Sequence, residues 1–139
     1  MSSLNFCPKC GDPISTRHDG ERERQACVAV GCGFIHFGEF SIGCAGVVTR
    51  EIDGVTKALL VQRGHNPFAG MWQIPGGYAE HDELLSTAVE REVHEESKVI
   101  ASVHDVLAFR HSLGGSRGGP ATNIYVIFRL NYESGEPAF

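Results

Sequence analysis

The feature that most constrains the fold of this chain is an acidic segment, GGYAEHDELLSTAVEREVHEESKV, which covers residues 76–99. Seven carboxylates fall between Glu80 and Glu96, and Arg91 is the one fixed positive charge among them. Asp82 is the predicted N-cap of a helix in this segment. Apolar residues recur at helical spacing after it, which predicts one helix face packed on a sheet: Leu84, Leu85, Ala88, Val89 and Val93.

Three carboxylates, those of Glu92, Glu95 and Glu96, lie at the predicted C-terminal end of this helix. The helix dipole disfavours acids there, and Glu92 and Glu96 are like-charged i,i+4 neighbours, so cations must be supplied. Residues three and four apart share a helix face, and oxygen ligands without cysteine or histidine favour a hard ion such as Mg²⁺. Because Mg²⁺ often shares its shell with substrate phosphates, the segment suggests a phosphate-bearing substrate. The alternative is an ordinary solvated acidic face.

The N-terminal segment is rich in cysteine. Its four cysteines are Cys7, Cys10, Cys27 and Cys32. The two-residue gap in the first pair lets both thiolates bind one ion, and four thiolates suit a closed tetrahedral zinc site. In the alternative, Cys27 or Cys32 is a small buried hydrophobe, and His18 or His36 completes the site or no site exists. Cys44 lies in an apolar stretch and is expected in the core.

The residue pattern changes at about residue 40. Residues 1–39 lack a sustained helical period and bury too little apolar surface to fold without a stabilising metal ion, which predicts a zinc ribbon. Residues 40–139 have the pattern of an α+β domain. The predicted extended segments are 42–49, 58–62, 71–74, 99–109 and 122–130. The turn-like pair Asp53-Gly54 predicts that the first two form a hairpin with a longer loop. Asn66-Pro67 breaks the chain, and the glycine-rich loop 111–121 is expected to be mobile, with room for a large substrate.

Composition excludes some functional classes. Hydrophobic residues make up 42% of the chain, as in ordinary globular proteins, and the net charge of −5 argues against a non-specific nucleic-acid or membrane binder. The N-terminus does not resemble a secretory signal, and the apolar run 42–48 is too short to span a bilayer. We therefore expect a cytoplasmic protein that needs no membrane, with its cysteines reduced.

The acidic segment resembles the box of the Nudix hydrolases, which hydrolyse a nucleoside diphosphate linked to another group. The match consists of Gly77, Glu83, the run from Arg91 to Glu96, and Val99, over 23 residues without a gap. A cysteine ribbon before such a domain resembles the NADH and FAD pyrophosphatase relatives. The resemblance implies a Nudix-type α/β/α sandwich with a mixed sheet, preceded by the small zinc ribbon.

Carried over by position, the resemblance implies that three carboxylates bind catalytic Mg²⁺ or Mn²⁺, those of Glu92, Glu95 and Glu96. The backbone carbonyl of Gly76 would add a ligand, and Glu83 and Arg91 would brace the glutamates. Water would attack a phosphorus of the pyrophosphate, with a box glutamate or a loop acid taking its proton.

Two departures from the family pattern stand out. Lys98 occupies the position of a usual glycine, which commonly closes the helix in a left-handed conformation at a cost of about 1 kcal/mol for other residues. Its positive charge partly offsets that cost. Members of the family normally continue with another strand and a helix, so a domain that stops at Phe139 is expected to be truncated or minimal, with its C-terminal part missing.

Substrate contacts are harder to predict. Arg63 is either a phosphate contact or a surface arginine, and four aromatic residues either stack on a base or pack in the core: Phe68, Trp72, Tyr78 and Phe109. We expect a small-molecule nucleotide diphosphate of the dinucleotide or nucleotide-sugar type, such as NADH, FAD or ADP-ribose. The alternatives are a nucleoside triphosphate pyrophosphohydrolase and a binding or regulatory module with an inactive Nudix domain. Dimerisation through the ribbon is compatible with catalysis.

Overall fold

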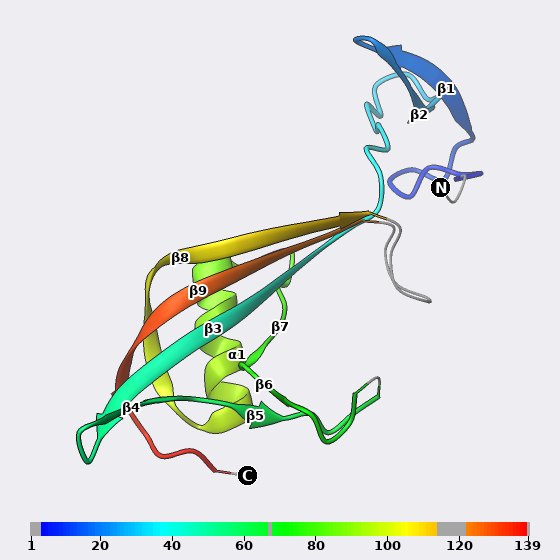
Figure 1. The fold of residues 1–139 in the computed structure, drawn as a ribbon. Helices are drawn as coiled ribbons and strands as arrows, with labels where there is room; N and C mark the ends of the chain where they lie inside the picture. The colour runs from blue at the N-terminus through cyan, green and yellow to red at the C-terminus, as the bar shows by residue number, and fades with distance from the viewer. Residues whose placement is uncertain (1–3, 67, 114–121, 139) are drawn as a thin grey trace. The chain divides into compact units, whose positions relative to one another are not determined.

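The computed structural model describes residues 4–66, 68–113 and 122–138. Pro67 and residues 114–121, which make up most of the expected loop 111–121, lie outside the described residues. The chain divides into two compact units, Met1–Glu39 and Phe40–Phe139, and both are drawn in Figure 1. Each unit is described below by itself.

The N-terminal unit is built around one hairpin. Strands β1 (Ile14–Asp19) and β2 (Arg22–Cys27) pair antiparallel, from Ile14 opposite Cys27 to Asp19 opposite Arg22. Cys7 and Ala26 are the buried apolar residues of this unit. Such a small core cannot hold a fold of this size without a staple, which is the role expected of the cysteines.

The second unit is a mixed five-stranded sheet. Its strands are β3 (Phe40–Ile52), β4 (Val55–Ala58), β7 (Gly76–Tyr78), β8 (Ile100–Leu113) and β9 (Thr122–Ser134). The order is β4-β3-β9-β8, with β7 also paired to β3. Strands β3 and β9 run parallel, and every other pair in this sheet is antiparallel. The strands β5 (Val61–Gln62) and β6 (Trp72–Gln73) form a separate two-stranded ladder.

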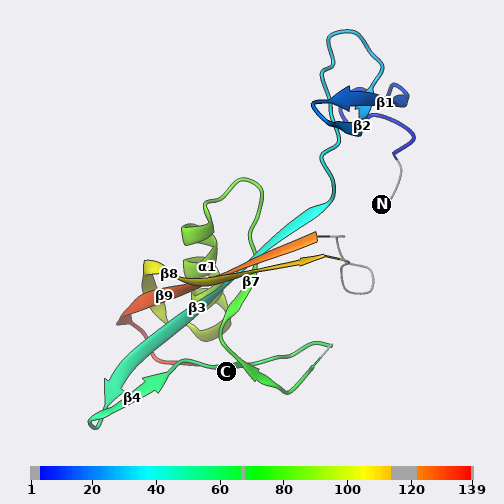
Figure 2. The same cartoon turned by 45° about the horizontal axis from the view of Figure 1, so that its top comes forward.

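Helix α1 (Leu85–Ser97) packs along one face of this sheet, as Figures 1 and 2 show. Val89 and Val93 are fully buried there, as predicted from the helical spacing. They contact a cluster from strands β3, β8 and β9: Cys44, Val48, Ala101, Phe128 and Leu130. One side of the helix is therefore packed, which leaves the opposite side available for chemistry.

The predicted hairpin after β3 was wrong in its partner strand. The pairing strand is Val55–Ala58, and not 58–62. Asp53 and Gly54 both have positive φ, 53° and 74°, which is the two-residue hairpin turn that sends the chain straight back. Pairing therefore begins at Val55, and the apolar residues that follow turn away to form β5.

Two further expectations need correction or refinement. Asp82 is not the N-cap, because the helix begins after Leu84, which makes no side-chain capping hydrogen bond. The α+β fold with a mixed sheet is confirmed, but the described residues contain a single helix, so they form one helical layer and not two. No helix in this part of the chain is long and apolar enough to cross a membrane.

Candidate active site

Arg91 is the centre of a hydrogen-bond network at the C-terminal half of α1. Its guanidinium donates to Glu83 twice, from Nη2 to Oε1 (2.7 Å) and from Nε to Oε2 (3.2 Å). Nη1 reaches Glu92 Oε1 at 2.8 Å and Glu95 Oε2 at 3.2 Å, and Nη2 donates to the carbonyl of Tyr78 (3.2 Å). One cation thus contacts three carboxylates of the acidic segment and ties the helix to β7.

Glu83 sits just before the helix and serves this network instead of capping the helix. Its Oε1 accepts the backbone N–H of Glu80 (2.9 Å) as well as the Arg91 hydrogen bond. The Arg91 guanidinium first, and the Glu80 N–H second, hold the pKa of Glu83 below its ordinary value. Glu83 is therefore an anion that fixes the orientation of Arg91.

Glu96 lies apart from the Arg91 network. Its Oε2 accepts the backbone N–H of Gly76 at 2.9 Å, which joins the end of α1 to the start of β7. Burial raises the pKa of Glu96, while the Gly76 hydrogen bond and the charge of Arg63 act in the opposite direction.

The backbone of β7 lies directly against the carboxylate of Glu92. A Cβ atom added at Gly77 would fall 2.6 Å from Glu92 Cδ and Oε1, so the Glu92 carboxylate would have to move from its position beside Arg91. Glycine at this position therefore lets the strand approach the acidic end of the helix closely. This close approach gives a physical reason for the glycine that the sequence pattern contains.

The three box glutamates lie on the same end of one helix, but their carboxylates are held by different partners. The ligand oxygens of these glutamates do not all lie within 4.8 Å of one another. Within the described ranges, only the four cysteines form a group of three or more Asp, Glu, His or Cys side chains that is so close. Arg91 holds Glu92 and Glu95, and Gly76 holds Glu96. The metal ligands that the three glutamates offer are all oxygen atoms, which fits a hard divalent cation such as Mg²⁺.

Lys98 adopts the left-handed conformation predicted for the position after the helix. Its φ is 65°, and its backbone N–H donates to the carbonyl of His94 at 2.8 Å. Its side-chain Nζ donates to the carbonyl of Glu95 at 3.2 Å. The lysine therefore closes the helix that a glycine commonly closes, and its charge lies at the negative end of the dipole.

A cavity of about 560 Å³ opens beside the box. Its walls come from β3, β7, β8, β9 and the β5–β6 ladder: Ser41, Gly43, Arg63, Gln73, Gly76, Gly77, Tyr78, Ser112, Leu113, Asn123 and Tyr125. Gly76 and Gly77 line this cavity and also lie against Glu96 and Glu92. A substrate in this space would thus have its reacting bond next to the acidic end of α1.

The predicted substrate residues are distributed unevenly around this cavity. Arg63 and Tyr78 line it, whereas Trp72 lines a different, largely apolar cavity of about 340 Å³. Phe109 is 71% exposed and is not among the residues that line the 560 Å³ cavity. Sequence reasoning missed Tyr125 and Asn123, because a strand residue far from the box carries no local signal of its position. It also missed Gln73, which lies shortly before the box at the end of β6.

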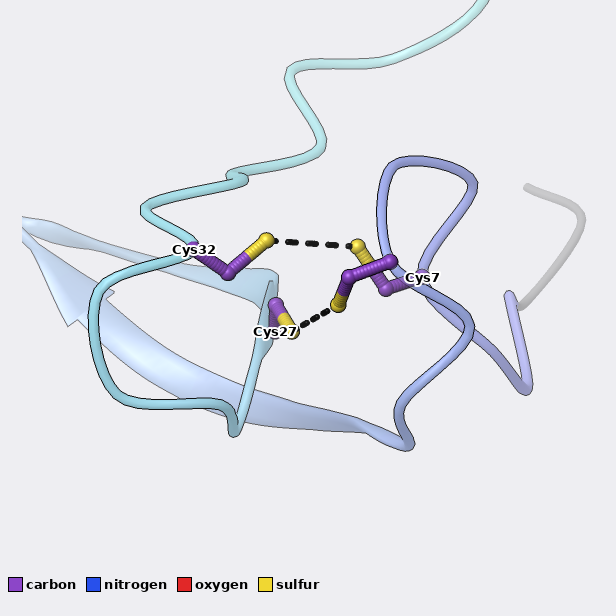
Figure 3. Close-up of side chains that lie close together, drawn as sticks. Cys7, Cys27 and Cys32 are labelled. Carbon is purple, nitrogen blue, oxygen red and sulfur yellow. Dashed lines mark hydrogen bonds between the residues drawn. The ribbon is translucent and has the colours of Figure 1, made fainter.

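The four cysteines of the N-terminal unit converge, as Figure 3 shows for Cys7, Cys27 and Cys32. Cys7 Sγ lies 3.7 Å from Cys32 Sγ, and Cys10 Sγ lies 3.4 Å from Cys27 Sγ. Tetrahedral zinc with bonds of about 2.3 Å needs sulfur atoms about 3.8 Å apart, so these thiols fit zinc. His18, the alternative ligand, instead faces Glu23 at 3.5 Å.

Hydrogen bonds also favour the thiolate form of Cys7. Burial opposes ionisation, but the backbone N–H of Lys9, which lies 3.4 Å from the sulfur, and further hydrogen bonds from Cys10 lower the pKa of Cys7 to about 7. Zinc binds thiolates, so the lowered pKa of Cys7 favours the form of this cysteine that binds a metal ion.

Comparison with known proteins gives relatives of this chain. It is 35% identical to an ADP-ribose pyrophosphatase of Methanocaldococcus jannaschii over 89 residues, which are 61% of this chain and 52% of the relative. It is 30% identical to an NAD-capped RNA hydrolase NudC of Stutzerimonas stutzeri over 137 residues, 98% of this chain and 44% of that protein. The chain thus spans about half the length of these curated relatives.

A solved structure supports the same relationship. The crystal structure of a NUDIX hydrolase from Nitrosomonas europaea superposes with a TM-score of 0.64 at 25% identity, covering 98% of this chain and 73% of that one. The NUDIX domain model of protein families matches residues 41–139, which contain the whole glutamate network and its cavity. This chain belongs to the Nudix hydrolase family.

Proposed function

We propose that this protein hydrolyses the pyrophosphate bond of a nucleoside diphosphate linked to another group, in a reaction that depends on Mg²⁺ or Mn²⁺. The observation that carries the proposal is the Arg91 network, which holds Glu83, Glu92 and Glu95 together beside Glu96 and the Gly76 backbone. A solvated acidic face would not need one arginine to contact three carboxylates and a backbone carbonyl.

The box residues have separate roles in this proposal. Glu92, Glu95 and Glu96, with the carbonyl of Gly76, would hold the divalent metal, while Glu83 and Arg91 position the glutamates. When bound, such a metal neutralises phosphate oxygens and lowers the pKa of a coordinated water. Water oxygen attacks phosphorus, the bridging P–O bond breaks, a carboxylate accepts the proton, and two phosphate-terminated products leave.

A dinucleotide or a nucleotide sugar is the preferred substrate class. The relatives are named for ADP-ribose and for NAD-capped RNA, both of which contain a nucleoside diphosphate linked to a second group. The 560 Å³ cavity beside the box has the size of an ordinary ligand site and is lined by Arg63, which would meet a phosphate. Hydrolysis of a nucleoside triphosphate is the competing activity, and ligand binding without turnover is the non-enzymatic one.

The test is a comparison of kcat/KM across ADP-ribose, NADH, FAD and the nucleoside triphosphates, with and without Mg²⁺. We expect metal-dependent cleavage with the dinucleotides and ADP-ribose favoured. Glu96→Gln keeps the size of the side chain and removes its charge, so turnover should fall by at least about 100-fold. A preference for a triphosphate would overturn the substrate class, and binding without cleavage would favour the regulatory alternative.

Glu90→Gln is the matched control for that variant. Glu90 lies on the same helix, but its Oε1 accepts the backbone N–H of Val103 at 2.8 Å, toward β8 and away from the cavity. Glutamine can accept the same hydrogen bond, so turnover should stay near that of the wild type. Equal losses in both variants would contradict the assignment of Glu96 to the site.

The remaining features of the proposal concern the whole protein. The cysteine cluster holds one structural zinc, and cysteines that serve as metal ligands suit a reducing compartment such as the cytoplasm. The partner is a small-molecule substrate, and the net charge of −5 argues against non-specific binding of nucleic acid. The ribbon supports a homodimer, which light scattering of the zinc-loaded protein would test.

A further inference from the structure

The cavity beside the box has a chemistry that the box itself does not explain. Among the described residues that line it, Arg63 is the one charged side chain, and its charge acts on Glu96. The other described lining side chains are neutral, and several of them are hydroxyl or amide groups. This part of the lining therefore suits one phosphate next to an uncharged polar group.

Tyr125 is one of two aromatic residues in the described lining of this cavity, together with the exposed Tyr78. It lies on β9 directly opposite Gly43 of the parallel strand β3. A Cβ atom at Gly43 would fall 2.5 Å from Tyr125 Cδ2 and 2.9 Å from Cε2, so the ring rests against bare backbone. Glycine weakens a strand interior and often marks a close approach, and here it admits the tyrosine ring.

The position of Tyr125 also links the cavity to the catalytic carboxylates. Burial raises the pKa of the Tyr125 phenol, and the nearby charges of Glu96 and Glu92 raise it further, while Arg63 lowers it. The phenol is therefore neutral at physiological pH. Gly76, whose N–H binds Glu96, lines the same cavity as Tyr125, so an aromatic group stacked on the ring would lie in the space that borders the box.

Two side-chain amides border the same space in fixed orientations. Asn123 Nδ2 donates to Ser41 Oγ at 2.7 Å, which leaves its carbonyl oxygen without a hydrogen-bond partner among residues 4–66, 68–113 and 122–138. Gln73 Oε1 accepts Arg63 Nη1 at 3.4 Å, so its NH₂ group points away from that arginine. The carbonyl oxygen of Asn123 is an acceptor and the NH₂ group of Gln73 is a donor, and this pair matches the hydrogen-bonding edge of a nitrogen heterocycle.

We propose that Tyr125, seated on Gly43, is the stacking platform for a planar nitrogen heterocycle of the substrate, with Asn123 and Gln73 contacting the edge of its ring. This inference rests on the proposed function and specifies one end of its substrate. The ring belongs to a ribose phosphate whose phosphate meets Arg63. Among the described lining residues, a triphosphate tail in the same space would face a single cation and a neutral aromatic surface.

The experiment measures binding, so it does not depend on turnover. The probes are AMP and ribose 5-phosphate, which share the phosphate and the sugar and differ by the adenine ring. In calorimetric titrations, the wild type should bind AMP about 10- to 100-fold more tightly than ribose 5-phosphate, the range expected for one stacked base. Tyr125→Ala should abolish this difference, and Tyr125→Phe should keep it.

Two further variants test the arrangement of the platform. Gly43→Ala should weaken AMP binding while leaving ribose 5-phosphate unchanged, because the added methyl group displaces the ring of Tyr125. Phe40→Ala is the control: Phe40 is an exposed aromatic residue on the same strand, outside the lining of the cavity, and its removal should change neither affinity. Thermal unfolding of each variant verifies that it is folded.

Each outcome decides one question. Equal binding of the two probes by the wild type, or unchanged AMP binding by Tyr125→Ala, would overturn the platform. A ring preference that depends on Tyr125, in a protein that cleaves no pyrophosphate, would leave the platform standing and defeat the proposed function. With hydrolysis present, Tyr125→Ala should raise KM for ADP-ribose about 10-fold or more and change kcat little.

Discussion

Arg91 shows how one residue organises the acidic end of the helix. Its five donor contacts reach Glu83, Glu92, Glu95 and the carbonyl of Tyr78. The guanidinium is planar and presents its donors in a fixed fork, so it can hold several carboxylates in defined positions where a lysine could not. The predicted bracing role of Glu83 complements that of Arg91, because Glu83 binds Nε and Nη2 of the guanidinium and orients it.

The bracing role of Glu83 predicts a pH dependence. Its folded-state pKa is lowered, so its contribution to stability is present above the unfolded value of about 4.3 and is lost as pH falls through the folded pKa. Glu83→Gln should therefore be less stable than the wild type at pH 7, and this difference should shrink as pH falls below about 4. Denaturant unfolding followed by the fluorescence of Trp72, the one tryptophan, measures it.

Glu80→Gln provides the control for this prediction. The Glu80 carboxylate makes no ion pair in the described part of the chain, and Glu83 contacts Glu80 through its backbone N–H and carbonyl. Its unfolding should follow that of the wild type at every pH. A stability difference for Glu83→Gln that stays constant from pH 7 to pH 3.5 would show that the Glu83 charge is not what holds Arg91.

At the scale of elements, the packing of α1 on β3 depends on Gly46. A Cβ atom there would lie 2.8 Å from Val93 Cγ2 and 2.9 Å from Leu130 Cδ1, so the helix approaches the strand as closely as a glycine permits. Gly46 also donates its N–H to the carbonyl of Pro75 at 2.9 Å, next to β7. The strand thus places the helix and the box backbone together.

Gly46→Ala should destabilise the second unit by about 1 to 3 kcal/mol through overpacking. Val93→Ala alone should cost about 2 kcal/mol by leaving a cavity, and the double variant should lose less than the sum, because the new methyl group fills space left by the valine. Guanidinium unfolding curves measure all three. Gly64→Ala, whose Cβ would meet nothing within 4 Å, should change stability by less than about 0.5 kcal/mol. Additive losses in the double variant would argue against this contact.

At the scale of the whole molecule, the chain joins two units with different sources of stability. The second unit has a buried apolar cluster between α1 and the sheet. The N-terminal unit has a two-stranded hairpin and four converging thiols, which makes bound metal the expected source of its folding free energy. Loss of the metal should therefore affect one unit before the other.

Chelation tests this separation. The purified protein should contain one zinc per chain, and its removal by a strong chelator should speed amide hydrogen exchange in β1 and β2 while α1 keeps its protection. Cys27→Ser should reduce the zinc content sharply. Cys44→Ala should retain zinc, because Cys44 is fully buried in the core of the other unit. Protection in β1 and β2 that survives metal loss would contradict the prediction.

The sequence by itself determined the features that depend on local spacing. The gaps between the cysteines and the apolar repeat of α1 are short-range patterns, and the converging thiols and the packed helix face agree with them. The left-handed conformation of Lys98 depends in the same way on the residues immediately around it. The N-cap and the hairpin partner strand were wrong, because turn geometry shifted both, and the described residues contain one helical layer where two were expected. Metal binding by the three box glutamates stays a prediction.

The tertiary structure decided which distant residues share the substrate cavity. Gly43 and Tyr125 are 82 positions apart in the sequence and meet only because β3 and β9 pair in parallel. Trp72 and Phe109, which the sequence offered as candidates for stacking on a base, are not among the residues that line that cavity, whereas Tyr125 is. An aromatic residue carries the same local signal in a core, on a surface or in a site. Strand order and register choose among these three environments, and they are set by packing across the whole sheet.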